Sequence, residues 1–271
     1  MAIHPTAVIA PGVQIGKDVH IGPYTVIEPD CIIGDNCRID AHVKIGRWTT
    51  IGAGTRIYCG AIVGEDPQDH RFKPDTYAPT YIGSNTTIRE YVTIHRSPFE
   101  GRKTSVGDHT LLMAFVHVGH DACIGNHVTA ANQTAFSGHV IVGDGAVVSG
   151  YVLVHQFCRI GALAMVGARA MLLQDVPPFC LLHENVISGP NIIGLRRAGM
   201  SNQSRLAIRK AIRKVYFEGL NLKNAIEQIE AGTMTPETTH LVNFLKEAHR
   251  GIMPGNPKFS GGNDDSDSAE G

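Results

Sequence analysis

The sequence has few aromatic residues, little charge and no long apolar run. Aromatic residues make up 6% and charged residues 18% of the 271 residues, and the formal net charge is −1. With 43% hydrophobic residues and so small a net charge, disorder of the bulk of the chain is excluded. Balanced charge also argues against general nucleic-acid binding. No apolar stretch reaches the length of a membrane span, so we expect neither a nucleic-acid partner nor an integral membrane protein.

Features of exported proteins are also lacking. The first residues, MAIHPTAVIAPG, include two prolines and no basic region, so we expect no signal peptide. Six cysteines in such a chain are expected to be reduced thiols. We therefore predict a cytoplasmic protein.

An aliphatic side chain recurs every six residues through most of the chain. The period runs from Ile3 to Val63, returns between Ile82 and Ile94, and then runs from Val106 to Leu172. Of these 26 positions, 24 are Ile, Val or Leu. An α-helix has 3.6 residues per turn and would spread such positions around its surface, so a helix is excluded here.

Two further regularities accompany the period. The residue four places after each aliphatic is small or β-branched, as at Val13, Val19, Thr25, Cys31, Cys37, Val43, Thr49, Thr55 and Ala61. Glycine often follows the aliphatic directly, as in Ile15-Gly16 and Ile33-Gly34. The pattern resembles the hexapeptide repeat of the left-handed parallel β-helix, in which three hexapeptides form one triangular coil of about 18 residues. We expect between eight and nine coils over residues 1–190, with glycine at turns that need positive φ.

Breaks in the period divide the chain further. Residues 64–81 and 95–105 lose the register and are predicted to be loops ejected from the β-helix. The double proline in QDVPPF ends the repeats. A helical domain is expected over 191–253, with helices over 204–219, 220–232 and 235–251. Ser201 or Ser204 is expected to cap the first helix and Thr235 the third. The acidic, low-complexity segment 254–271 is predicted to be disordered.

A coil of about 18 residues places distant histidines on one surface. The predicted columns are His120 with Gly138 and Gln156, Asp121 with His139 and Phe157, and Gly119 with Ser137 and His155. At ~4.8 Å per coil, His120, His139 and His155 should lie within about 10 Å of one another, outside the core. Ordinary surface histidines and a zinc site remain alternatives, although no acidic or cysteine set completes a zinc site.

Four segments in this region carry a family resemblance. They are HVGHDACIGN (117–126), SGHVIVGD (137–144), VHQFCRIGA (154–162) and QDVPPF (174–179). They resemble the bacterial UDP-N-acetylglucosamine O-acyltransferases, which transfer a 3-hydroxyacyl chain from acyl carrier protein in the first step of lipid A synthesis. The resemblance implies that His120 is the general base, that Asp121 orients it, and that the Gly138 N–H stabilises the oxyanion.

The resemblance also implies substrate-binding residues, with no metal and no cofactor beyond the phosphopantetheine of the carrier protein. These residues are Gln68, Asp69, Arg71, His95, His117, His139, His155, Gln156, Asn191 and Arg197. Ala168 maps to the end of the acyl groove, where alanine suggests a somewhat shortened groove. Ile193 and Ala198 depart from the Glu and Arg that are frequent in the family, which puts nucleotide contacts of 191–198 in doubt.

Partners follow from the resemblance and from charge. The family is homotrimeric and acts on UDP-N-acetylglucosamine. Segment 196–214 contains seven basic residues and no acidic residue: Arg196, Arg197, Arg205, Arg209, Lys210, Arg213 and Lys214. Because acyl carrier proteins are strongly acidic, this segment is a candidate docking face. A solvated helix face is the alternative.

Other functions remain open at this point. A related hexapeptide N-acyltransferase would act on a 3-amino or 2-amino UDP-sugar, but the 2-amino type has an extra N-terminal domain before its repeats. A γ-type zinc carbonic anhydrase would contain zinc. A non-catalytic β-helical scaffold or ice-binding surface would show rows of threonine on one face, which the sequence lacks.

Overall fold

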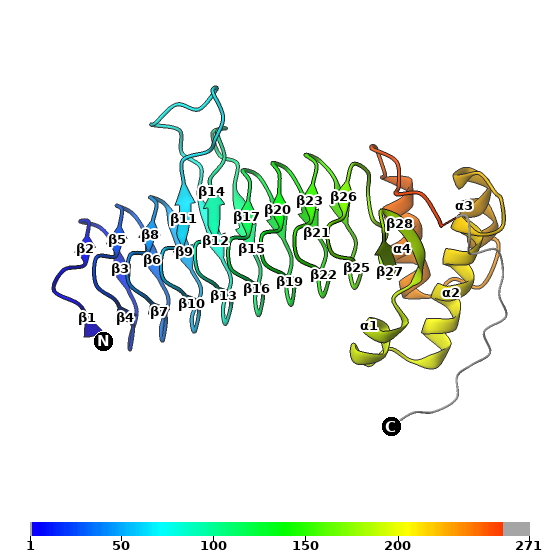
Figure 1. Ribbon diagram of the computed structural model, residues 1–271, viewed down its shortest axis with the longest axis horizontal. Helices are drawn as coiled ribbons and strands as arrows, with labels where there is room; N and C mark the ends of the chain where they lie inside the picture. The colour runs from blue at the N-terminus through cyan, green and yellow to red at the C-terminus, as the bar shows by residue number, and fades with distance from the viewer. Residues whose placement is uncertain (1, 257–271) are drawn as a thin grey trace.

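The computed structural model describes residues 2–256, which form a long parallel β-helix followed by four short helices (Figure 1). Three sheets run along its axis. The first contains β1 (Ala2–Ile3), β4 (His20–Ile21), β7 (Arg38–Ile39), β10 (Arg56–Ile57), β13 (Thr87–Ile88), β16 (Leu111–Leu112), β19 (Thr129–Ala130), β22 (Val147–Val148), β25 (Met165–Val166), β27 (Cys180–His183) and β28 (Val186–Pro190).

The second sheet contains β2 (Val8–Ile9), β5 (Val26–Ile27), β8 (Lys44–Ile45), β11 (Ile62–Glu65), β14 (Thr93–His95), β17 (His117–Val118), β20 (Ala135–Phe136), β23 (Leu153–Val154) and β26 (Met171–Leu172). The third contains β3 (Gln14–Ile15), β6 (Ile32–Ile33), β9 (Thr49–Ile51), β12 (Thr80–Ile82), β15 (Thr104–Val106), β18 (Cys123–Ile124), β21 (Ile141–Val142) and β24 (Arg159–Ile160). Each of the strands β1–β26 contains one predicted repeat position. The predicted parallel β-helix with a C-terminal helical region is therefore confirmed.

The core consists of the predicted aliphatic positions and the small residues between them. Ile27, Ile45 and Val118 are at most 1% exposed, and they align with the repeat positions of the next coil, which are Ile45, Val63 and Phe136. Cys31, Cys37 and Cys158, each four residues after an aliphatic position, are fully buried between the coils. Burying one aliphatic side chain stabilises the fold by ~1.5–3 kcal/mol, so the stack of coils accumulates a large apolar contribution. All six cysteines are free thiols.

The glycines after the aliphatic positions have a different role from the one predicted. A Cβ on Gly34 would lie 2.6 Å from the Ala53 nitrogen of the next coil, so glycine is required by close approach of the coils. Positive φ falls two residues later and is mostly carried by other residue types, such as Asn36 (φ 59°) and His42 (φ 59°). Their N–H groups donate to carbonyls of the preceding coil, which offsets the backbone strain.

Two loops leave the β-helix on one side, where Figure 1 shows them in cyan and green. Residues 66–79 connect β11 to β12, and residues 96–103 connect β14 to β15. Both lie within the predicted loops 64–81 and 95–105. The strands at their bases remain paired, since β11 and β14 are neighbours in the second sheet and β12 and β15 in the third.

The C-terminal region contains more structure than the sequence predicted. β27 and β28 form an antiparallel pair. The helices are α1 (Ile192–Arg197), α2 (Asn202–Tyr216), α3 (Leu222–Glu230) and α4 (Pro236–Lys246). Helix α1 was not expected from the sequence, because it has a single buried residue and hence no apolar period. Ser201 caps α2 and Thr235 caps α4, as expected. Helix α2 ends at Tyr216 and α4 at Lys246, earlier than the predicted ends at 219 and 251.

The helical region is joined firmly to the end of the β-helix. Arg159 donates to the buried Asp175 carboxylate and to the Phe244 carbonyl, and its guanidinium lies 4.0 Å from the centroid of the Phe244 ring. Ile187 pairs with Gly255, so the ordered chain includes 254–256 of the segment predicted to be disordered. The remainder of that segment, 257–271, lies outside the described residues. Within residues 2–256 no helix is both long and apolar enough to span a membrane.

Candidate active site

The candidate site lies at the corner between the second and third sheets, beside the two loops. His120 and Asp121 form the turn after β17. The His120 Nδ1–H donates to Asp121 Oδ2 over 2.8 Å, because a carboxylate can only accept. This bond leaves Nε2 of the neutral ring unprotonated. His120 is 9% exposed, so its basic nitrogen is held in a sheltered position.

Asp121 is held as an anion by its neighbours. Burial opposes ionisation, but hydrogen bonds from His120 and from the Ser97 hydroxyl (2.9 Å) outweigh it and lower the pKa of this carboxyl. The Asp121 N–H donates to Thr104 Oγ1, which fixes the turn. The anion therefore both orients the His120 ring and stabilises its protonated form.

Gly138 lies against the same imidazole, one coil further along the axis. A Cβ at this position would be 2.6 Å from His120 Nε2, so any side chain here would collide with the ring. The Gly138 carbonyl accepts from the Phe157 N–H, whereas its own N–H has no acceptor among the described residues. The predicted column of His120 and Gly138 is thus present, with a basic nitrogen beside a bare backbone donor.

An open cavity of about 180 Å³ lies in front of this pair. Its lining includes six of the predicted residues, Gln68, His95, His117, His120, Gly138 and Gln156. His95 Nδ1 lies 2.6 Å from the Asp66 carbonyl, so this nitrogen carries the proton and Nε2 is an acceptor. That Nε2 is buried without a partner in the described structure. His95 is therefore able to accept a hydrogen bond from a ligand hydroxyl.

The neighbouring histidines are kept neutral by burial. Burial, reinforced by the nearby His95 and His120, lowers the pKa of His117 to about 4. His117 Nδ1 pairs with the Thr93 hydroxyl at 2.9 Å. Burial also lowers the pKa of His139, although Asp121 opposes the shift. His139 stacks on Phe157 with the ring centroids 4.5 Å apart, so it forms the side wall of the corner.

The first loop supplies an ion pair near the cavity. Arg71 makes a bidentate contact with Asp69 and holds the pKa of that carboxyl well below its usual range. The Asp69 side chain is 13% exposed, whereas Arg71 is mostly exposed. Arg71 also lies over the Phe99 ring of the second loop, so the two loops contact each other above the site.

Other predicted residues lie elsewhere in this chain. His155 is exposed and is not among the residues that line the cavity; within residues 2–256 its ring nitrogen contacts only the Gln156 carbonyl. Ala168 is exposed at the corner between the first and second sheets. Asn191 caps α1 and donates to the Leu163 carbonyl, while Arg197 is exposed in the last turn of that helix. Ile193 and Ala198 are also exposed.

Sequence reasoning missed three contacts of the site. The Ser97 hydroxyl donates to the Asp121 carboxylate, and Thr104 accepts from the Asp121 N–H. The Thr93 hydroxyl pairs with His117. An ejected loop lengthens the coil, so Thr93 pairs with His117 across 24 residues. The 18-residue spacing therefore fails here. Counting columns with the loop removed would have placed Thr93 beside His117, but nothing in the sequence marks Ser97.

Three potential metal ligands also meet at this corner. His120, Asp121 and His139 offer atoms within 4.8 Å of one another, so Asp121 joins two histidines in a set of three possible metal ligands, whereas no acidic set completing a zinc site was expected from the sequence. The His120–Asp121 hydrogen bond already accounts for the closest of these contacts. The absence of a bound metal in the working protein stays a prediction.

The repeats and the site together define a hexapeptide-repeat transferase. The family model for the bacterial transferase hexapeptide repeat matches residues 2–29, 12–47 and 30–65. A second model, described as domain 2 of UDP-N-acetylglucosamine O-acyltransferase, matches residues 175–253.

Curated relatives and solved structures agree on this family. The acyl-[acyl-carrier-protein]--UDP-N-acetylglucosamine O-acyltransferase of Gloeothece citriformis is 40% identical over 207 residues, covering 74% of this chain and 75% of the relative. The enzyme of the same name from Ectopseudomonas mendocina is 41% identical over 203 residues, covering 73% and 78%. The crystal structure of LpxA, a UDP-N-acetylglucosamine acyltransferase from Bacteroides fragilis, superimposes with a TM-score of 0.89 at 40% identity, covering 92% of this chain and 99% of that one. The chain therefore belongs to the UDP-N-acetylglucosamine O-acyltransferase family, which confirms the resemblance inferred from the sequence.

Proposed function

We propose that this protein transfers a 3-hydroxyacyl chain from acyl carrier protein to the 3-hydroxyl of UDP-N-acetylglucosamine, the first step of lipid A synthesis. Family membership supports the reaction class. One observation of the structure carries the mechanism: the free Nε2 of His120 lies beside the bare backbone of Gly138, which has an unused N–H donor.

In this mechanism, His120 Nε2 accepts the proton of the sugar 3-hydroxyl as its oxygen attacks the thioester carbonyl. The carbonyl oxygen becomes an oxyanion that accepts a hydrogen bond from the Gly138 N–H. Collapse of the tetrahedral intermediate breaks the carbon–sulfur bond. The departing phosphopantetheine thiolate takes the proton back from His120, so the base is regenerated. Asp121 stabilises the imidazolium formed in between.

The remaining site residues are assigned to substrate binding. His95 Nε2 accepts from a sugar hydroxyl, since it is buried without a partner. Gln68, His117 and Gln156 line the same cavity and are assigned to the sugar, as is Asp69 of the loop beside it. His139 is assigned to the acyl chain, because it stacks with Phe157 at the edge of the site.

A complete site in this proposal needs a second copy of the chain. Ala168, Asn191 and Arg197 are expected to bind substrate, yet they lie away from the His120 corner of the same chain. The corner that carries Ala168 also exposes large apolar side chains, namely Tyr91, Phe115 and Tyr151. Exposed apolar surface of this kind favours association. We therefore propose a homotrimer in which His120 of one subunit faces Ala168 of its neighbour.

The proposal includes the partners and the setting of the enzyme. The basic face of α2, with Arg205, Arg209 and Arg213, is assigned to the acidic acyl carrier protein. No metal or cofactor is required, because the phosphopantetheine arrives on the carrier protein. The reaction is placed in the cytoplasm.

An acyl-transfer assay tests the function directly. The purified protein is incubated with UDP-N-acetylglucosamine and a ladder of 3-hydroxyacyl carrier proteins, and the product is analysed by mass and by mild alkali. We expect a product that is one acyl chain heavier and loses that chain in alkali, as an ester does. An alkali-stable product from a 3-amino UDP-sugar alone would support amide formation, and no product with any acceptor would refute the proposal.

A further inference from the structure

Arg96 is the largest fully buried side chain of the described residues, although it carries a permanent positive charge. It is 2% exposed and directly follows His95 at the end of β14. A buried guanidinium is costly unless its donors are satisfied, so its partners indicate what it stabilises. None of these partners belongs to the catalytic pair.

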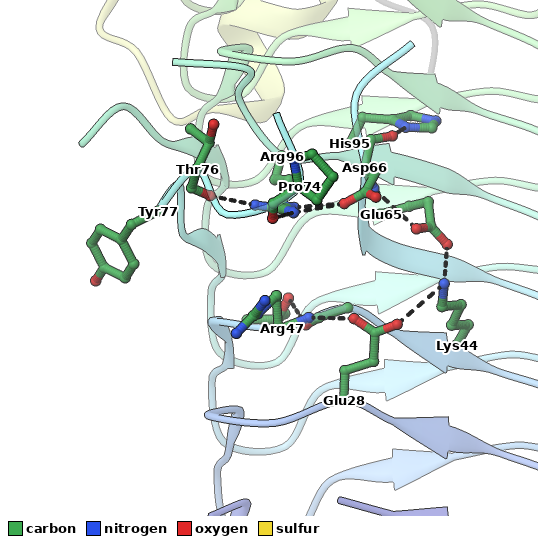
Figure 2. Close-up of polar contacts among 12 residues, drawn as sticks. Glu28, Lys44, Arg47, Glu65, Asp66, Pro74, Thr76, Tyr77, His95 and Arg96 are labelled. Atoms are coloured by element: carbon green, nitrogen blue, oxygen red, sulfur yellow. Dashed lines mark hydrogen bonds and ion pairs between the residues drawn. The ribbon is translucent and has the colours of Figure 1, made fainter. Parts of the chain in front are cut away.

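The guanidinium binds both limbs of the first loop. Its Nε and Nη2 donate to the Asp66 carboxylate at 2.9 and 2.7 Å, where the loop leaves β11 (Figure 2). Its Nη1 donates to the Thr76 carbonyl at 2.6 Å, where the loop returns. The group also lies over the rings of Trp48 and Phe72, at 5.1 and 4.7 Å from their centroids. Arg96 therefore closes the base of the loop.

The same contact reaches the cavity through the backbone. The Asp66 side chain binds Arg96, while the Asp66 carbonyl accepts from His95 Nδ1. That second bond fixes the proton on Nδ1 and presents His95 Nε2 to the cavity as an acceptor. Gln68, two residues further along the loop, lines the cavity. One arginine thus fixes the position of a loop residue and the tautomer of a histidine.

We propose that Arg96 is a positioning residue that holds loop 66–79 and the His95 ring in the geometry needed to bind the acceptor sugar. The inference rests on the proposed function, because it assigns the sugar to this cavity. The planar fork of arginine is required, since a lysine ammonium cannot bind the Asp66 carboxylate and the Thr76 carbonyl in the same manner. The basic residues of α2 that are assigned to the carrier protein are not among these contacts.

Two variants and a control test the proposal by kinetics. In Arg96→Lys, we expect the KM for UDP-N-acetylglucosamine to rise by about 10-fold or more, because misplacement of binding groups weakens substrate binding steeply. The KM for acyl carrier protein should remain unchanged. Asp66→Asn keeps the size of its side chain and should raise the same KM. Arg89→Lys is the matched control, since within the described part of the chain the Arg89 guanidinium contacts only Glu90 and the Tyr58 ring. Equal changes in both KM values, or none, would overturn the proposal.

Two measurements do not depend on catalysis. Trypsin should cleave after Arg71 faster in Arg96→Lys than in the wild type or Arg89→Lys, because the loop is released. The ¹⁵N resonances of His95 should report a single Nδ1–H tautomer in the wild type and a mixture in Arg96→Lys. If the wild type lacks acyl transfer, the proposed function fails while these measurements still decide the role of Arg96. An unchanged cleavage rate and an unchanged tautomer would refute it.

Discussion

Position 138 has two requirements that only glycine meets. It must leave room for the His120 ring, since a Cβ would lie 2.6 Å from Nε2, and it must present an unpaired N–H. Its position one coil beyond His120 satisfies both requirements. The chemistry of this residue therefore depends on what it lacks, which is a side chain.

Gly138→Ala should lower turnover without unfolding the protein. The added methyl group displaces the His120 ring or the 138 amide, and loss of an oxyanion donor costs about 10²–10³ in kcat. Steady-state kinetics with acyl carrier protein and UDP-N-acetylglucosamine measures the effect. Gly232→Ala is the control, because its nearest contact is a carbonyl at 3.4 Å. A kcat equal to that of the control would show that the amide does not act on the oxyanion.

His117 should make the stability of the protein depend on pH in the acidic range. Its pKa is about 4 in the folded protein and about 6.5 when unfolded, so the unfolded chain binds the proton more tightly. The free energy of unfolding should therefore fall as the pH drops from about 6.5 towards 4. Urea unfolding at several pH values measures this slope. His117→Gln should reduce the slope, and identical slopes in both proteins would contradict the shift.

The proximity of His120 and Gly138 could be predicted from residue spacing, whereas the loop residues that hold the site in place could not. A repeat of fixed length converts sequence distance into spatial distance, which placed His120 beside Gly138. Ser97 and Arg96 escaped prediction because they belong to a loop whose path follows tertiary contacts. The predicted coil of His155 was correct, but its ring contacts the backbone carbonyl of Gln156 instead of lining the cavity.

At the scale of elements, the close approach of successive coils governs the β-helix. The glycines after the aliphatic positions are needed because the next coil runs directly against them, as at Gly34 and Gly52. The sequence revealed where glycine recurs but not which of two reasons required it. The two reasons are a positive φ and the close approach of the next coil. They differ in their consequences, since an overpacked contact between coils is relieved only by moving a coil.

Gly34→Ala should destabilise the β-helix measurably. Its Cβ would lie 2.6 Å from the Ala53 nitrogen, and overpacking of this kind typically costs about 1–3 kcal/mol. Thermal unfolding followed by circular dichroism compares it with Gly232→Ala, where space is available. Equal melting temperatures of Gly34→Ala and Gly232→Ala would contradict this prediction, because the coils would then accommodate the added methyl group without loss of stability.

The basic face of α2 makes a separate prediction about the carrier protein. Reversing the charges of Arg205, Arg209 and Arg213 to glutamate should raise the KM for acyl carrier protein, because the partner is acidic. The KM for UDP-N-acetylglucosamine should stay unchanged. Arg209 and Arg213 are exposed, so the fold should tolerate the change. An unchanged KM for the carrier protein would relocate the docking face.

At the scale of the whole molecule, the residues assigned to one reaction lie on two corners of the β-helix. His120 lies between the second and third sheets, and Ala168 between the first and second. A single chain cannot bring them together because its coils are closed triangles. The proposed association of three copies through the apolar corner would bring the two corners together.

Phe115→Asp should therefore dissociate the protein and abolish its activity together. Phe115 is 53% exposed, and among residues 2–256 its ring stacks only on Tyr91, so the isolated fold should tolerate aspartate. Light scattering measures the mass of the particle, and the acyl-transfer assay its activity. A wild-type protein that is an active monomer would contradict the shared site.

The most direct measurement is the single-turnover rate of acyl transfer by His120→Ala, with acyl carrier protein and UDP-N-acetylglucosamine both saturating. Loss of the general base should lower this rate by about 10²–10⁴-fold, with carrier-protein binding unchanged. His127→Ala, at an exposed histidine stacked on His109 away from the cavity, should react at the wild-type rate. A wild-type rate in His120→Ala would remove the imidazole from the chemistry and leave the corner at Gly138 without its assigned role.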